Sequence, residues 1–498
     1  MYEIALGLSV LCLLGVGGYY VRSPAFSAFH PMTFYLAFHG FLFVIRPIIA
    51  RIYDFQIVYN VYMFRPSDSD KLAVILACNF GFLVFSFFCL RVGNMPMRFS
   101  ADAAIREEHR RLSQLYVWVL AIAGPPAIYS LVKTYSINNS VYEGMILDRA
   151  TGVVINTTRI GYIADLQLMA VSLCAILMWL SRFRLWSFIP ALGFVAMRAG
   201  SGGRGPFVVS MVSAGLFYLY EKRKRLPGIN VVLGAAAVIS LFGIVGDDRG
   251  ESLRVLMGIS EESAFTGDKD GPGRLEGMDF ANMEYFEYLV YVIPQRSGTY
   301  DYFLDNFQIF TEPVPRILWP GKPVGEPFRR VWLFDYGFPI GMTRSLPGEG
   351  WYAMGWMGVL IWCGLWGHLL GVIYRGYVRG PQTTIQTAMY MVFIPTLVVA
   401  FRDGSLLTPI RQTGAYFMPI WIWALLAKYA GVPNAKQLRA MLAFNARRAL
   451  IAGDAPAEMP AEANVRPTAA SAKLAALPPA VRRRRAMLGR SGGPAPAE

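Results

Sequence analysis

Long uninterrupted runs of hydrophobic residues recur along this chain, and short polar segments separate them. A run of about 20 apolar residues is long enough to cross the hydrocarbon core of a membrane as an α-helix. The pattern predicts membrane-spanning helices at residues 2–20, 31–50, 71–90, 115–132, 161–181, 185–199, 206–220, 229–246, 354–374, 384–401 and 413–430. We therefore expect an all-α polytopic integral membrane protein with about 11 transmembrane helices, within a range of about 10 to 14.

The composition supports the same class. Of the 498 residues, 55% are hydrophobic and only 16% are charged, which is too apolar for a water-soluble chain. The net charge of +14 would suggest a nucleic-acid partner in a soluble protein. Here, however, Lys and Arg concentrate in particular loops and in the tail, as membrane topology requires, so no nucleic-acid partner is expected. All five cysteines lie inside hydrophobic runs, which argues against a disulfide framework.

Two strongly basic loops indicate the orientation in the membrane. Five arginines fall between residues 91 and 111, and the basic run 222–225 follows the seventh predicted span. Cytoplasmic loops carry an excess of Lys and Arg, so both loops are predicted to be cytoplasmic. Counting spans from these loops places the N-terminus and one large loop, 247–350, outside the cytoplasm, and the C-terminus inside it.

The predicted spans divide the chain into three parts. Residues 1–430 form the transmembrane domain, and 247–350 is its large outer loop with short helices. Residues 431–452 are predicted to form a basic amphipathic helix that lies at the interface and contacts membrane lipids. Residues 453–498 are rich in Ala and Pro and carry a run of arginines, which predicts a disordered basic cytoplasmic tail.

The 247–350 loop is divided by charge. Asp247–Glu312 holds fourteen carboxylates and five basic residues, whereas Pro313–Gly350 holds three carboxylates and five basic residues. Residues 282–293, in the acidic part, are aromatic and apolar enough for an amphipathic helix lying in the interface. In the basic part, Pro and Gly interrupt regular structure and Trp, Arg and Lys gather, which favours a binding site over a linker.

Arginines collect at the predicted outer ends of the spans. Arg204 follows a glycine-rich turn, Arg249 follows the eighth span, and Arg402 and Arg411 follow the tenth. The planar guanidinium fork fits a phosphate or diphosphate better than the point charge of lysine does, so these residues predict a diphosphate site at the membrane face. Nearby tryptophans and tyrosines offer flat faces for sugar rings, although an interfacial aromatic belt contains the same residue types.

Several reaction classes lack their motifs. The sequence has no HExxH, no His/Cys cluster, no GxSxG and no Walker loop, and none of its four histidines lies in the 247–350 loop. Metal-dependent hydrolysis and ATP-driven transport are therefore disfavoured, and neither a metal ion nor a cofactor is expected. For Asp247 and Asp248, charge pairing at a helix end is favoured over a metal site.

Four segments occur in the order in which a known family carries similar ones. They are AGSGGRGPF (Ala199–Phe207), PRILWPGKP (Pro315–Pro323), PGEGWYAMGWMGVL (Pro347–Leu360) and FRDGSL (Phe401–Leu406). Together they resemble segments of the bacterial oligosaccharide repeat-unit polymerases, the Wzy-type O-antigen and exopolysaccharide polymerases, which are GT-C-like. The first segment departs from the family pattern by one Gly, and the last has its Gly and Asp transposed.

The resemblance implies a glycosyltransferase of the bacterial inner membrane that polymerises undecaprenyl-diphosphate-linked oligosaccharide repeat units on the periplasmic face, without a metal ion. A flippase and a chain-length regulator are its implied partners. We expect diphosphate binding by Arg204, Arg316, Arg344, Arg402, Arg249, Lys322 and Arg411. The expected catalytic base is Glu349, followed by Asp403 and Glu326. Sugar stacking is expected of Trp319, Trp351 and Tyr352.

Other roles are consistent with the same residues. An O-antigen ligase-like transferase would use the same donor but would make a single transfer. A lipid-linked oligosaccharide flippase or transporter is less favoured, because it would predict internal repeats and short loops, whereas this chain has one large outer loop and no visible repeat. The structural alternative for Glu349 and for the Arg402/Asp403 pair is a salt bridge that fixes a loop to a helix end.

Overall fold

The computed structural model describes residues 1–100, 102–138, 145–148, 153–156, 161–199, 205–229, 275–276, 280–314, 318–319, 322, 327–337 and 343–452. This part of the chain is predominantly helical, with one short antiparallel strand pair. Seven of its helices are long and apolar enough to cross a membrane. The chain is therefore an all-α polytopic membrane protein, as the hydropathy pattern predicts, and the total of about 11 spans stays a prediction.

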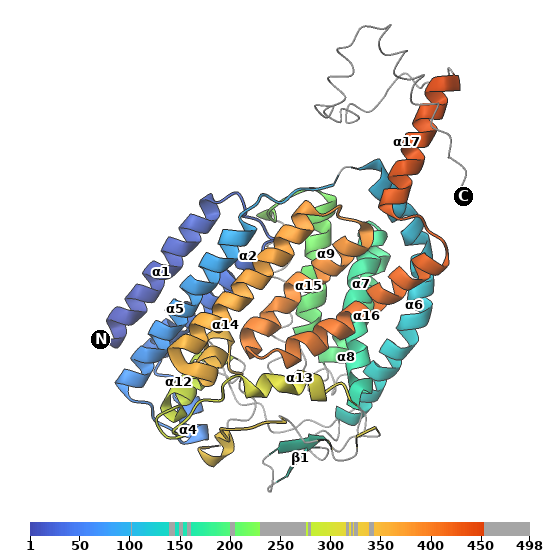
Figure 1. Cartoon of the computed structure of the whole chain (residues 1–498). Coiled ribbons are helices and arrows are strands. Elements are labelled where there is room, and N and C mark those ends of the chain that lie inside the picture. Colours follow the sequence, from blue (N-terminus) through green and yellow to red (C-terminus); the bar gives the residue numbers. More distant parts are fainter. Residues whose placement is uncertain are drawn as a thin grey trace, which may run out of the picture. The chain divides into compact units, whose positions relative to one another are not determined.

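The described residues contain a helix in each predicted span except 229–246, and they contain a strand pair that the pattern does not predict (Figure 1). The first half contains α1 (Tyr2–Arg22), α2 (Pro31–His39), the π-helix η1 (Gly40–Ile45), α3 (Arg46–Ile52), α4 (Ile57–Tyr62), α5 (Asp68–Gly93), α6 (Ala103–Asn138), β1 (Met145–Asp148), β2 (Val153–Asn156), η2 (Gly161–Leu168), α7 (Met169–Leu180), η3 (Leu185–Phe188), α8 (Ile189–Ala199) and α9 (Gly205–Glu221). The second half contains α12 (Asn282–Val292), η6 (Leu304–Phe307), α13 (Gln308–Thr311), η7 (Leu333–Asp335), α14 (Leu346–Arg379), α15 (Thr384–Asp403), α16 (Leu407–Tyr429) and α17 (Ala435–Ala452). Apart from its first residue, the predicted span 229–246 lies outside the described residues.

The chain forms two units, Met1–Lys436 and Gln437–Glu498. In the first unit, α5 and α14 lie side by side, and a Cβ at Gly367 of α14 would lie 2.5 Å from the carbonyl oxygen of Phe85 in α5. Small residues allow this close approach of two helix backbones, which is common in membrane proteins. The helix α17 begins at the last two residues of the first unit and continues in the second. It corresponds to the predicted helix at 431–452, whose interfacial position stays a prediction. The predicted tail lies outside the described residues.

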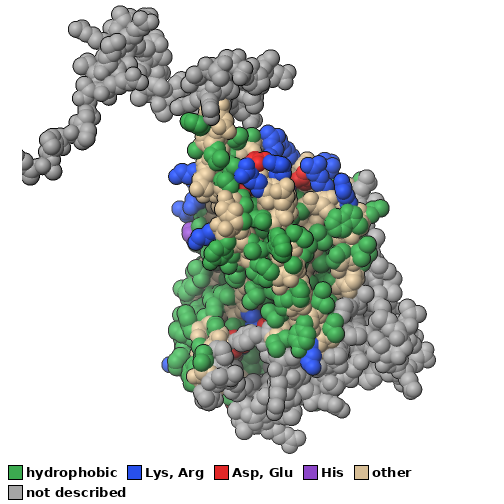
Figure 2. All heavy atoms as spheres, turned by 90° about the vertical axis from the view of Figure 1, so that its right-hand side faces the viewer, with side chains coloured by type: hydrophobic (Ala, Val, Ile, Leu, Met, Phe, Trp, Pro, Cys, Tyr) green, Lys and Arg blue, Asp and Glu red, His purple; other side chains and the backbone are tan. Residues whose placement is uncertain are grey.

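Contacts between distant turns define one end of the first unit, which we call the basic end. The Gln382 side chain bonds to the backbone of Arg98 and Ser100, and the Ala28 N–H donates to the Arg225 carbonyl. Figure 2 shows Lys and Arg side chains gathered at this end, above a broad hydrophobic belt. Exposed basic residues in these turns are Arg91, Arg98, Arg106, Arg110, Arg182, Arg184, Lys222, Arg223, Lys224, Arg225 and Arg379. The distribution agrees with the predicted cytoplasmic side, while the orientation itself stays a prediction.

The opposite end of the first unit, which we call the site end, joins the N-terminal helices to the loop that follows residue 247. Arg46 of α3 pairs with Glu284 of α12 at 2.6 Å, and both side chains are buried. Arg51 pairs with Glu3 at 2.7 Å, which brings the N-terminus to the same end. The N-terminus and the described part of the loop thus share one end, as the charge pattern predicts.

α14 consists of two helices separated by a sharp break. Met354 leaves the helical conformation, and Gly355 adopts a φ of +58°, which favours glycine. Residues 346–353 therefore fold back as a half-helix against the start of the second helix. A Cβ on Gly358 would overlap the Gly350 carbonyl oxygen, so the two backbones are in contact. The sequence predicts a span from 354 onward, where the second helix starts, but does not predict the half-helix.

α12 differs from its predicted environment. The sequence predicts an interfacial helix at 282–293, and a helix is present there, but every residue except Tyr291 is buried. The interfacial position is therefore wrong. The helix is enclosed because its acidic side chains find partners inside the protein: Glu284 binds Arg46, and Glu287 accepts a hydrogen bond from Tyr59 at 2.6 Å.

Candidate functional site

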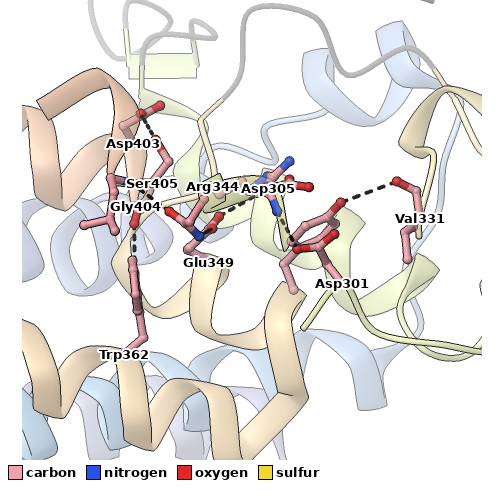
Figure 3. A network of polar contacts seen from close by, with 12 residues as sticks. Asp301, Asp305, Val331, Arg344, Glu349, Trp362, Asp403, Gly404 and Ser405 are labelled. Atoms are coloured by element: carbon pink, nitrogen blue, oxygen red, sulfur yellow. Dashed lines mark hydrogen bonds and ion pairs between the residues drawn. The ribbon is translucent and has the colours of Figure 1, made fainter. Parts of the chain in front are cut away.

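Arg344, just before the half-helix, is the centre of a charged cluster at the site end (Figure 3). Its Nη1 donates to Asp305 Oδ2 at 2.5 Å and to Glu349 Oε2 at 3.1 Å. The side chains of Glu349, Asp305 and Arg344 are 0%, 6% and 18% exposed. Charges buried to this degree are stable only when they are paired, so the three groups hold one another in place.

Glu349 lies in the first turn of the half-helix and is fixed from two sides. Its Oε1 accepts a hydrogen bond from Asn306 Nδ2 at 2.9 Å, in addition to the Arg344 contact at Oε2. Asn306 Oδ1 in turn accepts from the Leu406 N–H at 2.9 Å. Asn306 therefore links Glu349 to the turn that follows α15. A carboxylate oriented in this way is suited to accept a proton from a defined direction. Its ion pair with Arg344 also stabilises the fold.

The turn after α15 packs directly on the start of the half-helix. The Ser345 N–H donates to the Arg402 carbonyl at 2.9 Å, and Trp362 Nε1 donates to the Gly404 carbonyl at 2.8 Å. Gly404 has a φ of +80°, and a Cβ there would overlap the Ser345 carbonyl oxygen, so a side chain does not fit. The sequence segments around Glu349 and Gly404, which are far apart in the chain, thus form one structure.

α12 supplies two polar side chains to this region. Asn282 Nδ2 donates to the carbonyls of Thr343 and Arg402 at 2.9 and 3.0 Å, which joins the two backbone segments. Burial raises the pKa of Tyr285 to about 12, although the neighbouring Arg344 lowers it. Tyr285 is therefore a neutral hydroxyl at physiological pH.

The Arg344 guanidinium is a permanent positive charge in this cluster. Burial lowers its pKa, but Asp305 and Glu349 more than offset that effect and raise the pKa well above its usual range. The guanidinium carbon also lies 3.9 Å from the centre of the Tyr352 ring, a cation–π contact. Its position is therefore set by two carboxylates and one aromatic face.

Asp301 adds a third carboxyl group to the cluster. Its own N–H donates to the Tyr352 carbonyl at 3.1 Å, and its Oδ2 accepts the Asp305 N–H at 3.1 Å. The residue is fully buried. Burial and the neighbouring Asp305 raise the pKa of Asp301 to about 8, so its carboxyl group is mostly protonated at neutral pH.

Lys322 and Arg411, two of the predicted diphosphate-binding residues, meet at another carboxylate. Lys322 Nζ lies 3.4 Å from Glu312 Oε2 and donates to the Glu312 carbonyl at 2.9 Å. Arg411 lies 3.7 Å from Glu312 Oε1 and donates to Asp165 Oδ2 at 2.6 Å. Both basic residues therefore have acidic partners that tie the 312–322 segment to α16 and η2.

Arg402 and Asp403 end α15 and are partly exposed. The Arg402 carbonyl belongs to the backbone contacts above, and Asp403 Oδ2 accepts a hydrogen bond from Ser405 Oγ at 2.6 Å. The structure thus brings the predicted residues Arg344, Glu349, Arg402 and Asp403 to one region, at the junction of α15 and the half-helix.

The three aromatic residues predicted to stack on sugars have different environments. Trp319 is 40% exposed, whereas Trp351 is 7% exposed and its indole N–H donates to the Ile293 carbonyl at 3.1 Å. Tyr352 is 1% exposed, and its ring face is covered by Arg344. Trp319 is therefore the one of the three that offers an open face, while Trp351 and Tyr352 have packing roles. Sugar stacking stays a prediction.

Four predicted site residues lie outside the described residues: Arg204, Arg249, Arg316 and Glu326. Their roles stay predictions.

The sequence pattern does not single out Asp301, Asp305 or Asn306. They lie in the acidic part of the loop, where many carboxylates obscure any individual one. Asp301 lies before the 3-10 helix η6, and Tyr302 and Phe303 between it and Asp305 have positive φ, so helical spacing does not bring the two carboxyl groups together. Glu284 likewise becomes notable only through its contact with Arg46, which belongs to a distant segment.

The cluster offers one fixed cation, Arg344, and three carboxyl groups: Glu349, which two partners orient, Asp305, which pairs with Arg344, and Asp301, which has a raised pKa. This set can transfer protons and stabilise negative charge. Among the residues that the structure describes, no group of three His, Cys, Asp or Glu side chains is arranged to hold a metal ion. No protein-family model, curated protein or solved structure matches this chain.

Proposed function

We propose that this protein is a membrane-embedded glycosyltransferase that polymerises undecaprenyl-diphosphate-linked oligosaccharide repeat units at the periplasmic face of a bacterial inner membrane. One observation carries the proposal. Two of the segments that resemble the polymerase family, around Glu349 and Gly404, are in contact through Asn306 and Ser345 and enclose a buried Arg–carboxylate cluster. This cluster lies opposite the basic end, on the side where a positive-inside orientation places the periplasm.

The reaction would be a direct displacement at a sugar carbon. A hydroxyl oxygen of the acceptor repeat unit attacks the anomeric carbon of the donor glycan and forms the new glycosidic C–O bond. The bond from that carbon to the diphosphate oxygen breaks, and its electron pair leaves with the diphosphate. Glu349 takes the hydroxyl proton, which makes the acceptor oxygen a stronger nucleophile.

Guanidinium groups would stabilise the departing diphosphate, because negative charge grows on its oxygens as the bond breaks. Arg344 is the charge that the cluster holds in place. In this proposal it opens toward the diphosphate when substrate binds, and Arg402 at the adjoining helix end is the second candidate. Asp305 limits the movement of Arg344, since it binds the same nitrogen.

Glu349 is a better base than Asp403 in this geometry. Glu349 is fully buried and is oriented by Arg344 and Asn306, whereas Asp403 is partly exposed and binds the neighbouring Ser405. A carboxylate with fixed orientation and little contact with water is more effective at directed proton abstraction. Loss of such a base reduces the rate by roughly 10²–10⁴.

The test uses purified full-length protein in liposomes with synthetic undecaprenyl-diphosphate-linked repeat units and no ATP. We expect a ladder of products, and we expect E349Q to slow its formation by about 10²–10⁴. The control is D335N, which removes an exposed carboxylate of the same loop and should leave the ladder unchanged. A single transfer product would favour a ligase-like transferase. A folded protein that makes neither product would refute glycosyl transfer, and an unaffected E349Q would refute the choice of base.

A further inference from the structure

Asp301 and Asp305 present an unusual pair of carboxyl oxygens next to Arg344. Oδ2 of Asp301 accepts the Asp305 N–H, and Oδ2 of Asp305 accepts from Arg344. The Oδ1 atoms of both residues are buried, and in the described part of the chain neither has a hydrogen-bond partner. Both residues are more than nine-tenths buried. Two buried carboxyl groups thus lie close together with one oxygen each unsatisfied.

Two ionised carboxylates in this position would raise the free energy of the folded protein. A buried acceptor without a donor loses the hydrogen bonds that it makes in water, and two adjacent negative charges repel in a medium of low dielectric constant. One proton removes both penalties, because the protonated group becomes a donor to its neighbour and the repulsion ends. Carboxyl pairs that hold a single proton are a known solution to this problem.

We propose that Asp301 and Asp305 share one proton, and that this protonated pair sets the charge around Arg344 so that Glu349 is free to act as the base. The first part stands on the burial and the geometry alone, and the second part rests on the proposed glycosyl transfer. Asp301 and Asp305 are positioning residues in this inference, since they act through Arg344.

The charge balance explains why the shared proton matters. With one proton on the pair, the pair and Glu349 carry one negative charge each and Arg344 carries one positive charge, so a single negative charge remains. When Glu349 then takes the acceptor proton, the cluster becomes neutral. Without the shared proton, the resting cluster would hold one more buried negative charge, which would draw Arg344 toward the pair and repel a diphosphate.

The surroundings contain the groups that this balance requires. Burial, and next the proximity of Asp305, raise the pKa of Asp301 to about 8, so the pair keeps its proton at neutral pH. Within the described residues, four titratable or charged groups lie next to the pair. These groups are Tyr285 from α12, Arg344 from the segment before the half-helix, and Glu349 and Tyr352 from the half-helix.

Infrared spectroscopy of the purified full-length protein tests the shared proton directly, because only protonated carboxyl groups show the carboxylic C=O stretch. The spectra are recorded in an E287Q background, since burial raises the pKa of Glu287 to about 7 and its own band would interfere. We expect a band at pH 7 that disappears as the pH rises past about 8. The D301N substitution should abolish it, whereas D335N should not.

A second variant covers the case in which D301N does not fold. In D305N, Asp301 loses the carboxylate with which it shares the proton, so the band should shift or vanish. A band that is unchanged in the folded variants, or absent from the parent protein at pH 7, would overturn the inference. The parent titration needs no substitution at the pair.

The product ladder separates this inference from the proposed function. Activity of the parent protein should fall above about pH 8 as the pair loses its proton, and this fall should be absent in D301N, where Asn replaces the neutral Asp. A merely structural Asp301 would not change the shape of the pH profile. If the infrared band is assigned to the pair but no product ladder forms, the shared proton is supported and glycosyl transfer is refuted. If product ladders form but the band is absent, the shared proton is refuted.

Discussion

Replacing Arg344 by Gln should be among the most destabilising changes in the cluster. Removal of one partner from a buried ion pair costs about 3–5 kcal/mol, because the other charge is left uncompensated. Here Glu349 and Asp305 lose the same partner, and neither side chain is more than 6% exposed. We therefore expect R344Q to lower the free energy of unfolding by about 4 kcal/mol or more.

The partner variant sharpens this prediction. E349Q leaves Arg344 paired with Asp305 at 2.5 Å and retains an oxygen that can accept from Asn306, so we expect a cost of about 1–2 kcal/mol. In the double variant R344Q/E349Q, Asp305 alone is left without its counter-charge. The double cost should thus be smaller than the sum of the single costs by about 1–3 kcal/mol.

The assay is denaturant titration of the purified proteins in detergent micelles, followed by tryptophan fluorescence. R51Q is the matched control, because Arg51 forms a similar ion pair with Glu3 but both side chains are more than half exposed. Exposed ion pairs contribute about 0–1 kcal/mol, so R51Q should be nearly neutral. An R344Q protein within about 1 kcal/mol of wild type, or strictly additive costs, would show that the cluster does not hold buried charges as argued.

Three further predictions concern other parts of the fold. G358A should unfold or markedly destabilise the protein because its Cβ would overlap the half-helix backbone, whereas G376A, with open space around it, should not; the same titration compares them. Burial raises the pKa of Glu287 to about 7. Its contribution to the free energy of unfolding is therefore complete below about pH 4.5 and is lost as the pH rises through about 7. The loss is at most ~1.4 kcal/mol per pH unit. The denaturant midpoint of unfolding should therefore change less with pH in E287Q than in the wild type. Equal pH dependence in the two proteins would contradict a raised pKa of Glu287. W351A should lower the free energy of unfolding by about 3–5 kcal/mol because the indole is buried. W319A should leave the free energy of unfolding almost unchanged and affect only the product ladder.

The seven long apolar helices of the described residues could be predicted because the membrane leaves few choices. A hydrocarbon core admits only long apolar helices with internally satisfied backbones, so hydropathy alone locates them. The half-helix at 346–353 could not be predicted in this way, since Pro347, Gly348 and Gly350 disfavour a helix by intrinsic propensity. It forms because Gly350 and Gly358 allow two backbones to touch, and that contact depends on the break between them.

The site could be predicted only in part. Glu349 and Arg344 are conspicuous because they are charged residues next to a hydrophobic span, where such groups are rare. Asp305 and Asn306 gave no comparable signal, because their importance comes from contacts with residues some forty to one hundred positions away. Sequence position alone carries no information on such pairings. The buried position of α12 has the same origin, since Arg46 belongs to a different segment.

The reversal at Gly355 decides at which depth the charged cluster lies. In one continuous helix, Gly350 would lie roughly 12 Å beyond Gly358 along the axis, at about 1.5 Å per residue. The fold-back instead brings Gly350 level with Gly358, so that Glu349 lies beside the beginning of the span and next to the turn after α15. The diphosphate of a lipid-linked glycan is held at the membrane face by its lipid, and a protein group that acts on it must lie at that same depth. For the proposed reaction, a half-helix that returns toward the span would meet this requirement, and the close backbone contact at Gly350 and Gly358 needs the glycine-rich segment where the cluster is built.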